Sequence, residues 1–240
     1  MEDLLIDITV SLVLSALLGK VCHHVGLLTP GGATAAFLMD TAIGTLGSTR
    51  WLFLLVIFAI LGFVATNFKL SKKTQMGVQE GTHGERRAKN IIGVALPPLI
   101  IAVMDFIMEG YTDVMSTAFI ATIAVAAADT AASELGVSDS KVWLITNFKR
   151  VAPGTDGGVS VRGTLASVIA SLSFSIIGYL VIFGTMDIHV LIPAFCGIIG
   201  CFMDSIIGAT LETRGIVSKY ANNCITGLMG GLLAIPLYLI

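Results

Sequence analysis

Residues 114–133 read VMSTAFIATIAVAAADTAAS, an apolar run of 20 residues that contains a single ionisable side chain, Asp129. A helix needs roughly 20 apolar residues to cross the hydrocarbon core of a bilayer, because each residue advances it by about 1.5 Å. An ionisable side chain inside such a run is costly unless it faces the protein interior or an aqueous cavity. The run therefore predicts a membrane-spanning helix with a candidate functional acid.

Further apolar runs flank this one on both sides. They occupy residues 4–20, 31–47, 51–67, 91–108, 164–186, 188–210 and 223–240. The run 31–47 is short and contains Asp40, so its assignment is the least secure. The pattern predicts an all-α, polytopic membrane helix bundle of about eight transmembrane helices, with seven as the alternative.

Composition supports the same class of protein. The chain of 240 residues is 55% apolar and 12% charged, whereas soluble domains carry about 25% charged residues. Mean hydropathy is +0.90. These values exclude a soluble enzyme, a disordered chain and a nucleic-acid-binding protein. We expect a single integral membrane domain over residues 1–240, with the loops 68–90, 134–163 and 211–222 forming its site.

The basic residues indicate how the bundle is oriented. If all eight runs span, thirteen of the fourteen Lys and Arg residues share one side, and only Arg50 lies opposite. The thirteen are Lys20, Lys69, Lys72, Lys73, Arg86, Arg87, Lys89, Lys141, Lys149, Arg150, Arg162, Arg214 and Lys219. By the positive-inside rule this side is cytoplasmic and both termini lie outside. In a prokaryote the membrane would be the plasma membrane.

Two acids share one depth in the predicted bundle. Asp129 lies sixteen residues after Asp113, and Asp204 lies seventeen residues after Asp187. Both would therefore lie roughly 24–26 Å from the outer boundary, near the cytoplasmic end of parallel helices. Two carboxylates beside a basic loop suit Mg²⁺, which favours one or two carboxylates together with phosphate oxygens. The alternative is that each carboxylate pairs with a Lys or Arg of a loop.

The segment 147–164, NFKRVAPGTDGGVSVRGT, is the most informative loop. Its glycines allow backbone N–H groups to converge on an anion, and its three basic residues and the hydroxyls of Ser160 and Thr164 surround them. Thr164 is expected to open the next helix, whose first N–H groups favour phosphate. A plain turn would not need these bases and hydroxyls, so the segment favours phosphate binding. The Gly-Lys-Ser/Thr ending of a Walker motif is absent.

Two helix starts on the same side offer a second phosphate site. Arg86 and Arg87 with Asn90 begin one helix, and Asn222 with Asn223 begins the last. Arginine binds phosphate through paired N–H groups. The positive-inside rule alone also accounts for basic residues in this loop, so their arrangement at a helix start is the stronger signal.

Three blocks of sequence support a family resemblance: residues 129–136 (DTAASELG), 153–160 (PGTDGGVS, then Gly163-Thr164) and 204–209 (DSIIGA). Together they resemble an integral membrane family whose plant member is the phytyl-phosphate kinase of vitamin E synthesis. The stretch 28–33 (LTPGGA) and Arg86-Arg87-x-x-Asn90 fit as well, so the resemblance covers nearly the whole chain. More distantly, an Asp-x-x-Ala motif before a Gly-rich basic loop is similar to dolichol and phytol kinases and CDP-diacylglycerol synthases.

The resemblance implies phosphorylation of an isoprenyl monophosphate, of the phytyl or geranylgeranyl type, to the diphosphate. The distant relatives use CTP with Mg²⁺ at the cytoplasmic face. Their Lys-Ser/Thr-x-Glu-Gly block appears here as residues 158–163, GVSVRG, with neither the Lys nor the Glu. CTP or another nucleoside triphosphate therefore remains open as the donor.

The resulting hypothesis assigns a role to each motif. Asp129 and Asp204 hold the metal, helped by Glu134 or Glu212, and Lys149 and Arg150 complete the catalytic group. The nucleotide phosphates meet Ser133, Asn147, Gly154, Thr155, Asp156, Gly157, Gly158, Ser160, Arg162, Thr164 and Ser205. The acceptor phosphate meets Arg86, Arg87, Asn90, Asn222 and Asn223. The expected partners are an isoprenyl phosphate lipid, a nucleotide and membrane lipids, without nucleic acid; the sequence leaves a homodimer open.

Three other functions remain open. A CTP-dependent cytidylyltransferase would use the same metal site and release pyrophosphate while forming a CDP-linked lipid. A proton-coupled transporter would instead depend on the mid-membrane acids Asp40 and Asp105. A structural membrane protein would tolerate the loss of Asp129.

Overall fold

The structure, a computed structural model, describes residues 2–68, 70–77 and 84–240, and their side chains except those of residues 2–4 and 72. Lys69 and the side chain of Lys72, two of the basic residues named above, lie outside the described residues. The same holds for part of the predicted loop 68–90.

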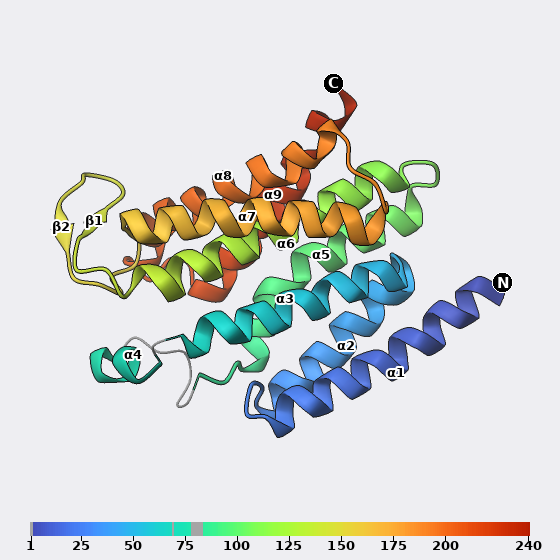
Figure 1. Cartoon of the computed structure of the whole chain (residues 1–240), viewed down its shortest axis with the longest axis horizontal. Coiled ribbons are helices and arrows are strands. Elements are labelled where there is room, and N and C mark those ends of the chain that lie inside the picture. The colour runs from blue at the N-terminus through green and yellow to red at the C-terminus, as the bar shows by residue number, and fades with distance from the viewer. Residues whose placement is uncertain (1, 69, 78–83) are drawn as a thin grey trace.

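All eight predicted runs form helices. They are α1 (Glu2–His24), α2 (Pro30–Leu46), α3 (Thr49–Asn67), α5 (Ala88–Ile107), α6 (Thr112–Gly136), α7 (Val161–Ile182), α8 (Leu191–Ile207) and α9 (Lys219–Leu239). A short helix, α4 (Leu70–Met76), follows α3; a 3₁₀ turn, η1 (Ile188–Val190), leads into α8, and a π-helical turn, η2 (Gly208–Glu212), extends it. The architecture is thus the predicted helical bundle (Figure 1).

Within the described residues, seven helical segments are long and apolar enough to cross a membrane. Helix α8 counts among them together with η1 and η2, over Ile188–Glu212, whereas α2 has only 17 residues. Nevertheless, α2 runs back along α1. It starts just after α1 ends, at the Thr29 cap. Helix α3 begins shortly after α2 ends, and there Thr49 Oγ1 donates to Asp7 Oδ1 at 2.6 Å. The end of α2 therefore lies near the start of α1. Eight helices therefore connect the two ends of the bundle.

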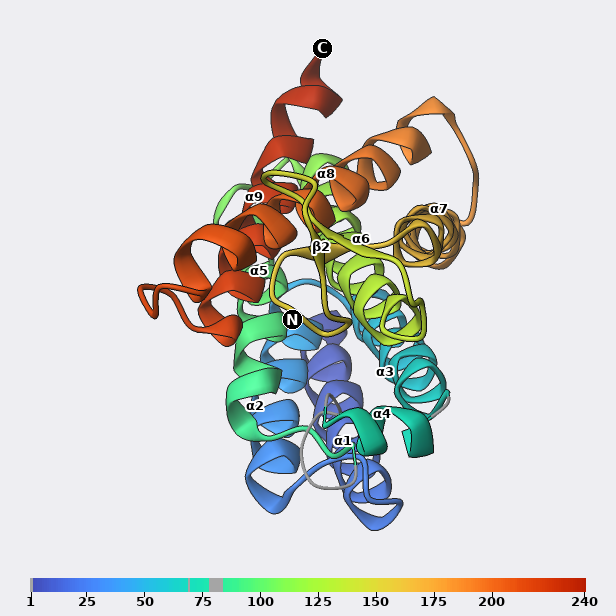
Figure 2. The same ribbon diagram turned by 90° about the vertical axis from the view of Figure 1, so that its left-hand side faces the viewer.

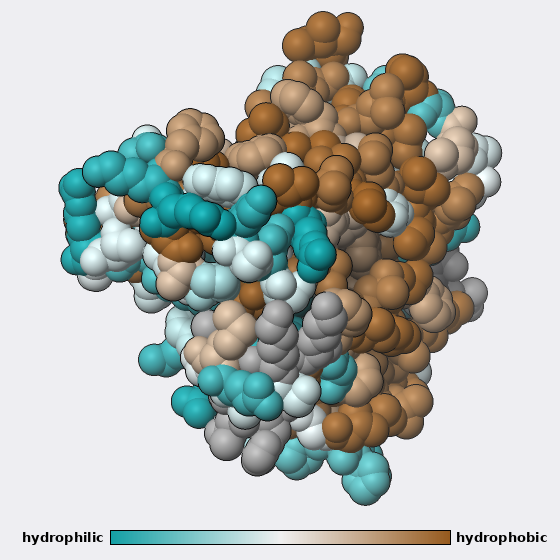
Figure 3. Space-filling view, turned by 60° about the vertical axis from the view of Figure 1, so that its left-hand side comes forward, coloured by the Kyte–Doolittle hydropathy of each residue, from teal (hydrophilic) through white to brown (hydrophobic). Residues whose placement is uncertain are grey.

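The two ends of the bundle differ in polarity. Helices α1, α3, α6 and α8 finish at one end, where α2, α5, α7 and α9 begin; we call it the basic end. Arg50 lies at the opposite end, where its guanidinium donates to the Ile182 carbonyl at 2.7 Å. Figure 3 shows hydrophilic residues gathered at the basic end and hydrophobic residues over the sides of the helices. An apolar belt between polar ends is the surface expected of a bilayer-embedded bundle.

A small sheet at the basic end was not predicted. Strands β1 (Val142–Leu144), β2 (Arg150–Val151) and β3 (Gly158–Val159) pair antiparallel in the order β2-β1-β3. Trp143 faces Arg150 on one side and Val159 on the other. Strands of two or three residues are too short to show an alternating pattern, so sequence periodicity does not detect them.

Helix α6 is the centre of the bundle. It packs against α3, α5, α7, α8 and α9 and is buried along most of its length. Figure 2, which looks onto the basic end, shows α6 between the α7–α9 group and the group of α1–α3 and α5. Gly200 of α8 and Gly230 of α9 both contact the side chain of Val125, where any Cβ would overlap Val125 Cγ2. Residues without side chains allow helices to approach this closely.

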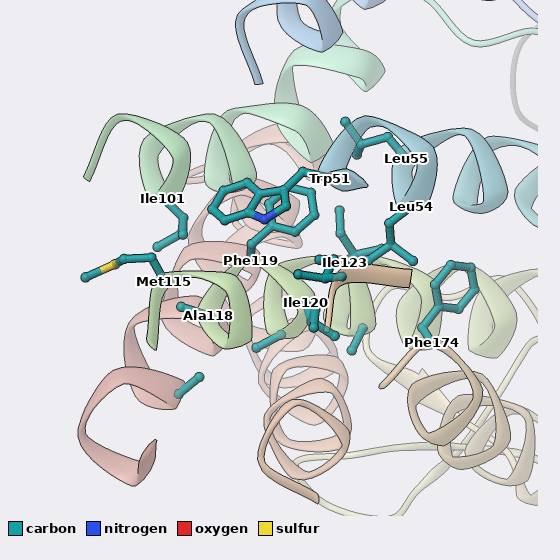
Figure 4. Packing of buried hydrophobic residues seen from close by; sticks show 14 of the residues in the cluster. Trp51, Leu54, Leu55, Ile101, Met115, Ala118, Phe119, Ile120, Ile123 and Phe174 are labelled. Atoms are coloured by element: carbon teal, nitrogen blue, oxygen red, sulfur yellow. The ribbon is translucent and has the colours of Figure 1, made fainter. Parts of the chain in front are cut away.

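The apolar core fills the half of the bundle away from the basic end. Trp51 of α3 stacks on Phe119 of α6 with ring centroids 4.2 Å apart (Figure 4). The indole Nε1 donates to Ser116 Oγ at 3.3 Å, so its one polar atom is satisfied. Ile101 and Met115 complete the same cluster. This half is densely packed, whereas the basic half contains cavities.

Substituting Ala for Gly200 or Gly230 should destabilise the bundle. The added Cβ overlaps Val125, a β-branched side chain with little rotamer freedom, so the helices must separate. We expect a loss of about 1–3 kcal/mol, measured as a lower thermal unfolding midpoint in detergent. Gly62→Ala is the matched control, because a Cβ there meets no atom within 4 Å. An unchanged midpoint for both substitutions at the α6 contact would contradict this packing account.

Candidate functional site

Two cavities occupy the basic half of the bundle. The larger, of about 310 Å³, lies between the ends of α6 and α8, the start of α7 and the glycine loop 152–157; we call it the polar cavity. The smaller, of about 170 Å³, lies among α1, α2, α3, α5, α6 and α9; we call it the apolar chamber. Both cavities are lined by Asp129, Ser133, Glu134, Lys219 and Asn223, so they adjoin.

The structure brings the two intramembrane acids together. The carboxyl groups of Asp129 and Asp204 lie within hydrogen-bonding reach of each other in the polar cavity. Asp204 Oδ1 is buried and has no hydrogen-bond partner among the described residues. Two adjacent carboxylates favour a shared proton or a bound cation, because like charges at this distance repel.

The remaining predicted ligands, Glu212 and Glu134, line the same polar cavity but are engaged by other side chains. Glu212 bonds the Asn222 side chain, and Glu134 belongs to a separate ion-pair cluster. Among residues 2–68, 70–77 and 84–240, no three His, Cys, Asp or Glu side chains gather closely enough to hold a metal ion. The donor set therefore fits a cation held by two carboxylates and completed by ligand oxygens and water, which is the usual arrangement for Mg²⁺.

The glycine loop reaches Asp204 because two glycines allow close contact. Gly157 has φ of +72°, and a Cβ on it would lie 2.6 Å from the Ser205 carbonyl oxygen. A Cβ on Gly208 would in turn lie 3.1 Å from the Gly157 nitrogen. The loop backbone thus packs directly on the end of α8 and the start of η2. Only glycine combines this backbone conformation with this approach.

Most of the predicted nucleotide site lines the polar cavity. The residues that do so are Ser133, Gly154, Thr155, Asp156, Gly157, Gly158, Ser160, Thr164 and Ser205. Two of the hydroxyls have local roles. Ser133 Oγ donates to the Thr130 carbonyl at 3.1 Å, and Ser205 Oγ donates to the Cys201 carbonyl at 3.3 Å.

Ser160, not Thr164, marks the start of α7. The helix begins at Val161, and the buried Ser160 Oγ accepts the Gly163 N–H at 3.1 Å as its N-cap. Thr164 was expected to open this helix but lies one turn inside it. Ser160 Oγ also lies 3.5 Å from the Gly136 carbonyl, so it links α7 to the end of α6. Capping occupies the hydroxyl that the sequence assigned to phosphate.

Four of the residues predicted for the catalytic group and the nucleotide site lie away from both cavities. Asn147, Lys149 and Arg150 occupy the exposed turn and strand of the β1–β2 hairpin, where Asn147 Oδ1 accepts the Lys149 N–H at 3.0 Å. Arg162 lies beside Asp139. The pKa of the Asp139 carboxyl is lowered first by the hydrogen bond from the Lys141 N–H and then by Arg162. The structure does not bring these side chains to the Asp129–Asp204 pair.

Glu134 holds a buried ion-pair cluster at the boundary of the two cavities. Lys73 Nζ lies 2.5 Å from Glu134 Oε2 and also donates to the carbonyls of Ala65 and Thr66. Arg86 lies 3.5 Å from Glu134 Oε1, which accepts from Thr66 Oγ1 at 3.0 Å. The cluster joins α6 to α3, α4 and the start of α5. Its cations therefore engage Glu134, which the sequence had proposed as a metal ligand.

Of the five predicted acceptor-phosphate residues, three line a cavity and two, Arg87 and Asn222, do not. Arg86 and Asn90 line the apolar chamber, and Asn223 lines both cavities. Arg87 is exposed, and its N–H donates to Asn90 Oδ1 at 3.0 Å, which caps α5. Asn222 is buried and donates through Nδ2 to the Asp204 carbonyl at 3.0 Å. Asn222 thus attaches α9 to α8 beside the acid pair.

Two lysines line the cavities without having been assigned to the site. Lys73 is buried in the polar cavity, and Lys219 lies at the boundary of both cavities. Charge in a cytoplasmic loop is expected from topology alone, so the sequence did not distinguish them from other lysines. The sequence feature that could have pointed to Lys219 is its position three residues before Asn222 and four before Asn223.

Replacing Glu134 should destabilise the protein more than replacing its ion-pair partner Lys73. Glu134→Gln leaves the Lys73 ammonium buried with only carbonyl partners, a change that typically costs about 3–5 kcal/mol. Lys73→Met leaves Glu134 with Arg86 and Thr66, so we expect a smaller decrease in the thermal unfolding midpoint. Equal decreases, or the reverse order, would show that Lys73 is not held as described.

The chain is similar to known membrane proteins over most of its length. The chain is 31% identical over 237 residues to an uncharacterized membrane protein of Methanocaldococcus jannaschii, covering 98% of this chain and 96% of that protein. Protein PGR of Arabidopsis thaliana is 33% identical over 210 residues, covering 78% of this chain and 73% of PGR. The chloroplastic protein VTE6 of the same plant is 29% identical over 155 residues, covering 63% of this chain and 46% of VTE6.

No solved structure matches the chain. The sequence profile of the family described as integral membrane protein DUF92 matches residues 13–229. The match includes both acids, the glycine loop and the residues shared by the two cavities. The chain belongs to the DUF92 family of integral membrane proteins.

Proposed function

We propose that this protein is a membrane-embedded phosphotransferase that converts an isoprenyl monophosphate to its diphosphate with a nucleoside triphosphate. One observation supports this reaction class above others: a polar cavity with two carboxylates adjoins an apolar chamber at Asp129. A nucleotide and a lipid substrate need such neighbouring compartments. The substrate class comes from the resemblance of the three motif blocks to the phytyl-phosphate kinase family.

The acid pair would hold Mg²⁺. Asp129 and Asp204 offer adjacent carboxylates, one with a buried oxygen that has no hydrogen-bond partner among the described residues. When bound, Mg²⁺ neutralises charge on the transferring phosphate and orients it. Phosphate oxygens and water would complete its coordination.

The protein's own residues would position the two phosphates. The backbone of residues 154–158 would hold the nucleotide phosphates, while Arg86 and Lys219 would hold the acceptor phosphate at the mouth of the apolar chamber. An acceptor phosphate oxygen attacks the γ-phosphorus, the bond to the β–γ bridging oxygen breaks, and a nucleoside diphosphate leaves. The acceptor is already ionised, so no general base is required.

The proposal also covers the nucleotide that donates the phosphate and the side of the membrane on which the site lies. The distant resemblance to dolichol kinases and CDP-diacylglycerol synthases favours CTP, although the altered block at residues 158–163 makes comparison with ATP, GTP and UTP necessary. The segregation of basic residues favours a cytoplasmic site in a plasma membrane. The cytidylyltransferase alternative uses the same acids, so the products distinguish it from a kinase.

The first test is phosphate transfer by purified protein in nanodiscs with Mg²⁺, γ-labelled nucleotide and geranylgeranyl monophosphate. We expect labelled diphosphate, and a decrease in kcat of at least about hundredfold for Asp129→Asn and for Asp204→Asn, because each removes a charge opposite the transferring phosphate. Asp105→Asn is the matched control, since Asp105 is an acid near the far end of α5 with a buried oxygen. It should retain activity.

The outcomes separate the candidate functions. Label from α-labelled CTP that enters the lipid, with release of pyrophosphate, would identify a cytidylyltransferase. Absence of transfer with any nucleotide, from protein shown to be folded, would reject the phosphotransferase. Proton-coupled transport that needs Asp105 and tolerates Asp129→Asn would establish the transporter.

Substituting two lysines in turn tests which side chains bind the phosphates. Lys219 lines both cavities, whereas Lys149 lies on the exposed hairpin. We expect Lys219→Ala to raise the KM of the acceptor at least about tenfold and Lys149→Ala to change it by less than about twofold. A larger effect of Lys149 in steady-state assays would show that the hairpin closes over the cavity during turnover.

A further inference from the structure

The apolar chamber approaches the surface of the bundle between α1 and α3. Leu18 and Cys22 of α1 line the chamber, as do Ala59, Gly62 and Phe63 of α3. The two helices are joined at the end opposite the cavities by the bond from Thr49 to Asp7. Near the basic end, α1 and α3 thus both contribute to the wall of the chamber. We call the part of the chamber between these lining residues the gap.

The wall at this gap is thin. Gly62 lines the chamber, and a Cβ built on it meets no heavy atom within 4 Å. Phe63, the next residue, lines the chamber while 37% of its surface is exposed. The neighbouring side chains Val21 and Val64 are 51% and 59% exposed on the apolar outer surface of the helices. Around Gly62 the chamber therefore lies close to the apolar outer surface of the bundle.

The two ends of the chamber differ in a way that selects an amphiphile. Toward α5 and α9 it is lined by Arg86, Asn90 and Lys219, which suit an anionic head group. Farther from the basic end it is lined by Leu55, Phe58 and Ala59 of α3, which suit a hydrocarbon, and also by Asp40 of α2. An anionic lipid already lies with its head at the membrane surface and its tail in the bilayer. Moving sideways into the chamber would leave both parts in surroundings of the same polarity.

We propose that the gap between α1 and α3 is a lateral portal through which the hydrocarbon tail of the acceptor enters from the bilayer, with Gly62 as the residue that sets its width. This inference rests on the proposed isoprenyl phosphate acceptor. Glycine at position 62 leaves space for the tail where any larger side chain would fill it. Gly62 is therefore a specificity-determining residue for long tails.

The first test is Gly62→Leu, assayed with monophosphates of five, ten and twenty carbons. The added side chain occupies open space and replaces a helix-weakening glycine, so folding should be preserved. We expect kcat/KM for the twenty-carbon acceptor to fall at least about tenfold, and that for the short, water-soluble acceptors to change by less than about threefold. Val64→Leu, on the lipid face of the same helix, is the matched control and should leave both unchanged.

The second test locates the tail without turnover. Geranylgeranyl monophosphate with a diazirine at mid-tail is photolysed with the protein in nanodiscs, and the labelled peptides are identified by mass spectrometry. We expect label within residues 17–24 of α1 and 59–66 of α3, and its loss in Gly62→Leu. Label on α7 or α8 that persists in Gly62→Leu would overturn the portal.

The two tests distinguish the portal from the proposed reaction. If no acceptor is phosphorylated by the wild-type protein but the label appears on α1 and α3 and depends on Gly62, the reaction fails and the portal stands. If the wild-type protein is active and Gly62→Leu lowers activity with all chain lengths equally, the portal fails and the reaction stands.

Discussion

The close contact of α8 and α9 with α6 is the constraint on which the rest of the structure depends. Gly200 and Gly230 approach the same side chain, Val125, from two helices, which surrounds α6 with protein. Asp129 lies one turn beyond Val125 on α6, and Asp204 lies one turn beyond Gly200 on α8. The packing that excludes lipid from α6 therefore also sets the distance between the two acids, because each acid lies one helical turn from the contact between Val125 and Gly200.

Packing density is distributed unevenly along the bundle. The half around Trp51 and Phe119 is filled by aromatic and aliphatic side chains, and the half toward the basic end leaves two cavities. The dense half supplies the stability that a hollow half lacks, since cavities forfeit contacts that close packing provides. In the proposed function this division would serve an amphiphilic substrate, because its head group and its tail require different surroundings.

The sequence predicted the helices and the level of the acid pair, because span length, charge segregation and rise per residue follow from the bilayer itself. The sequence assigned Lys149 and Arg150 to the site, but the pairing of β1 with β2 places them on an exposed hairpin. Strands of two residues show no alternating pattern by which this pairing could have been predicted. The sequence also assigned Glu134 to a metal, whereas Lys73, 61 positions earlier, holds it in an ion pair. Such contacts depend on tertiary packing, which a single sequence does not encode in local periodicity.

The position of the two chain ends has a practical consequence. Helix α1 begins and α9 finishes away from both cavities; Figure 1 marks these two ends at the right and at the top. Chain termini away from buried contacts tolerate added sequence. Segments attached before α1 or after α9 would therefore extend away from the two cavities. Fluorescent reporters, affinity handles or sorting sequences can be appended at either end of this scaffold without obstructing entry to its interior.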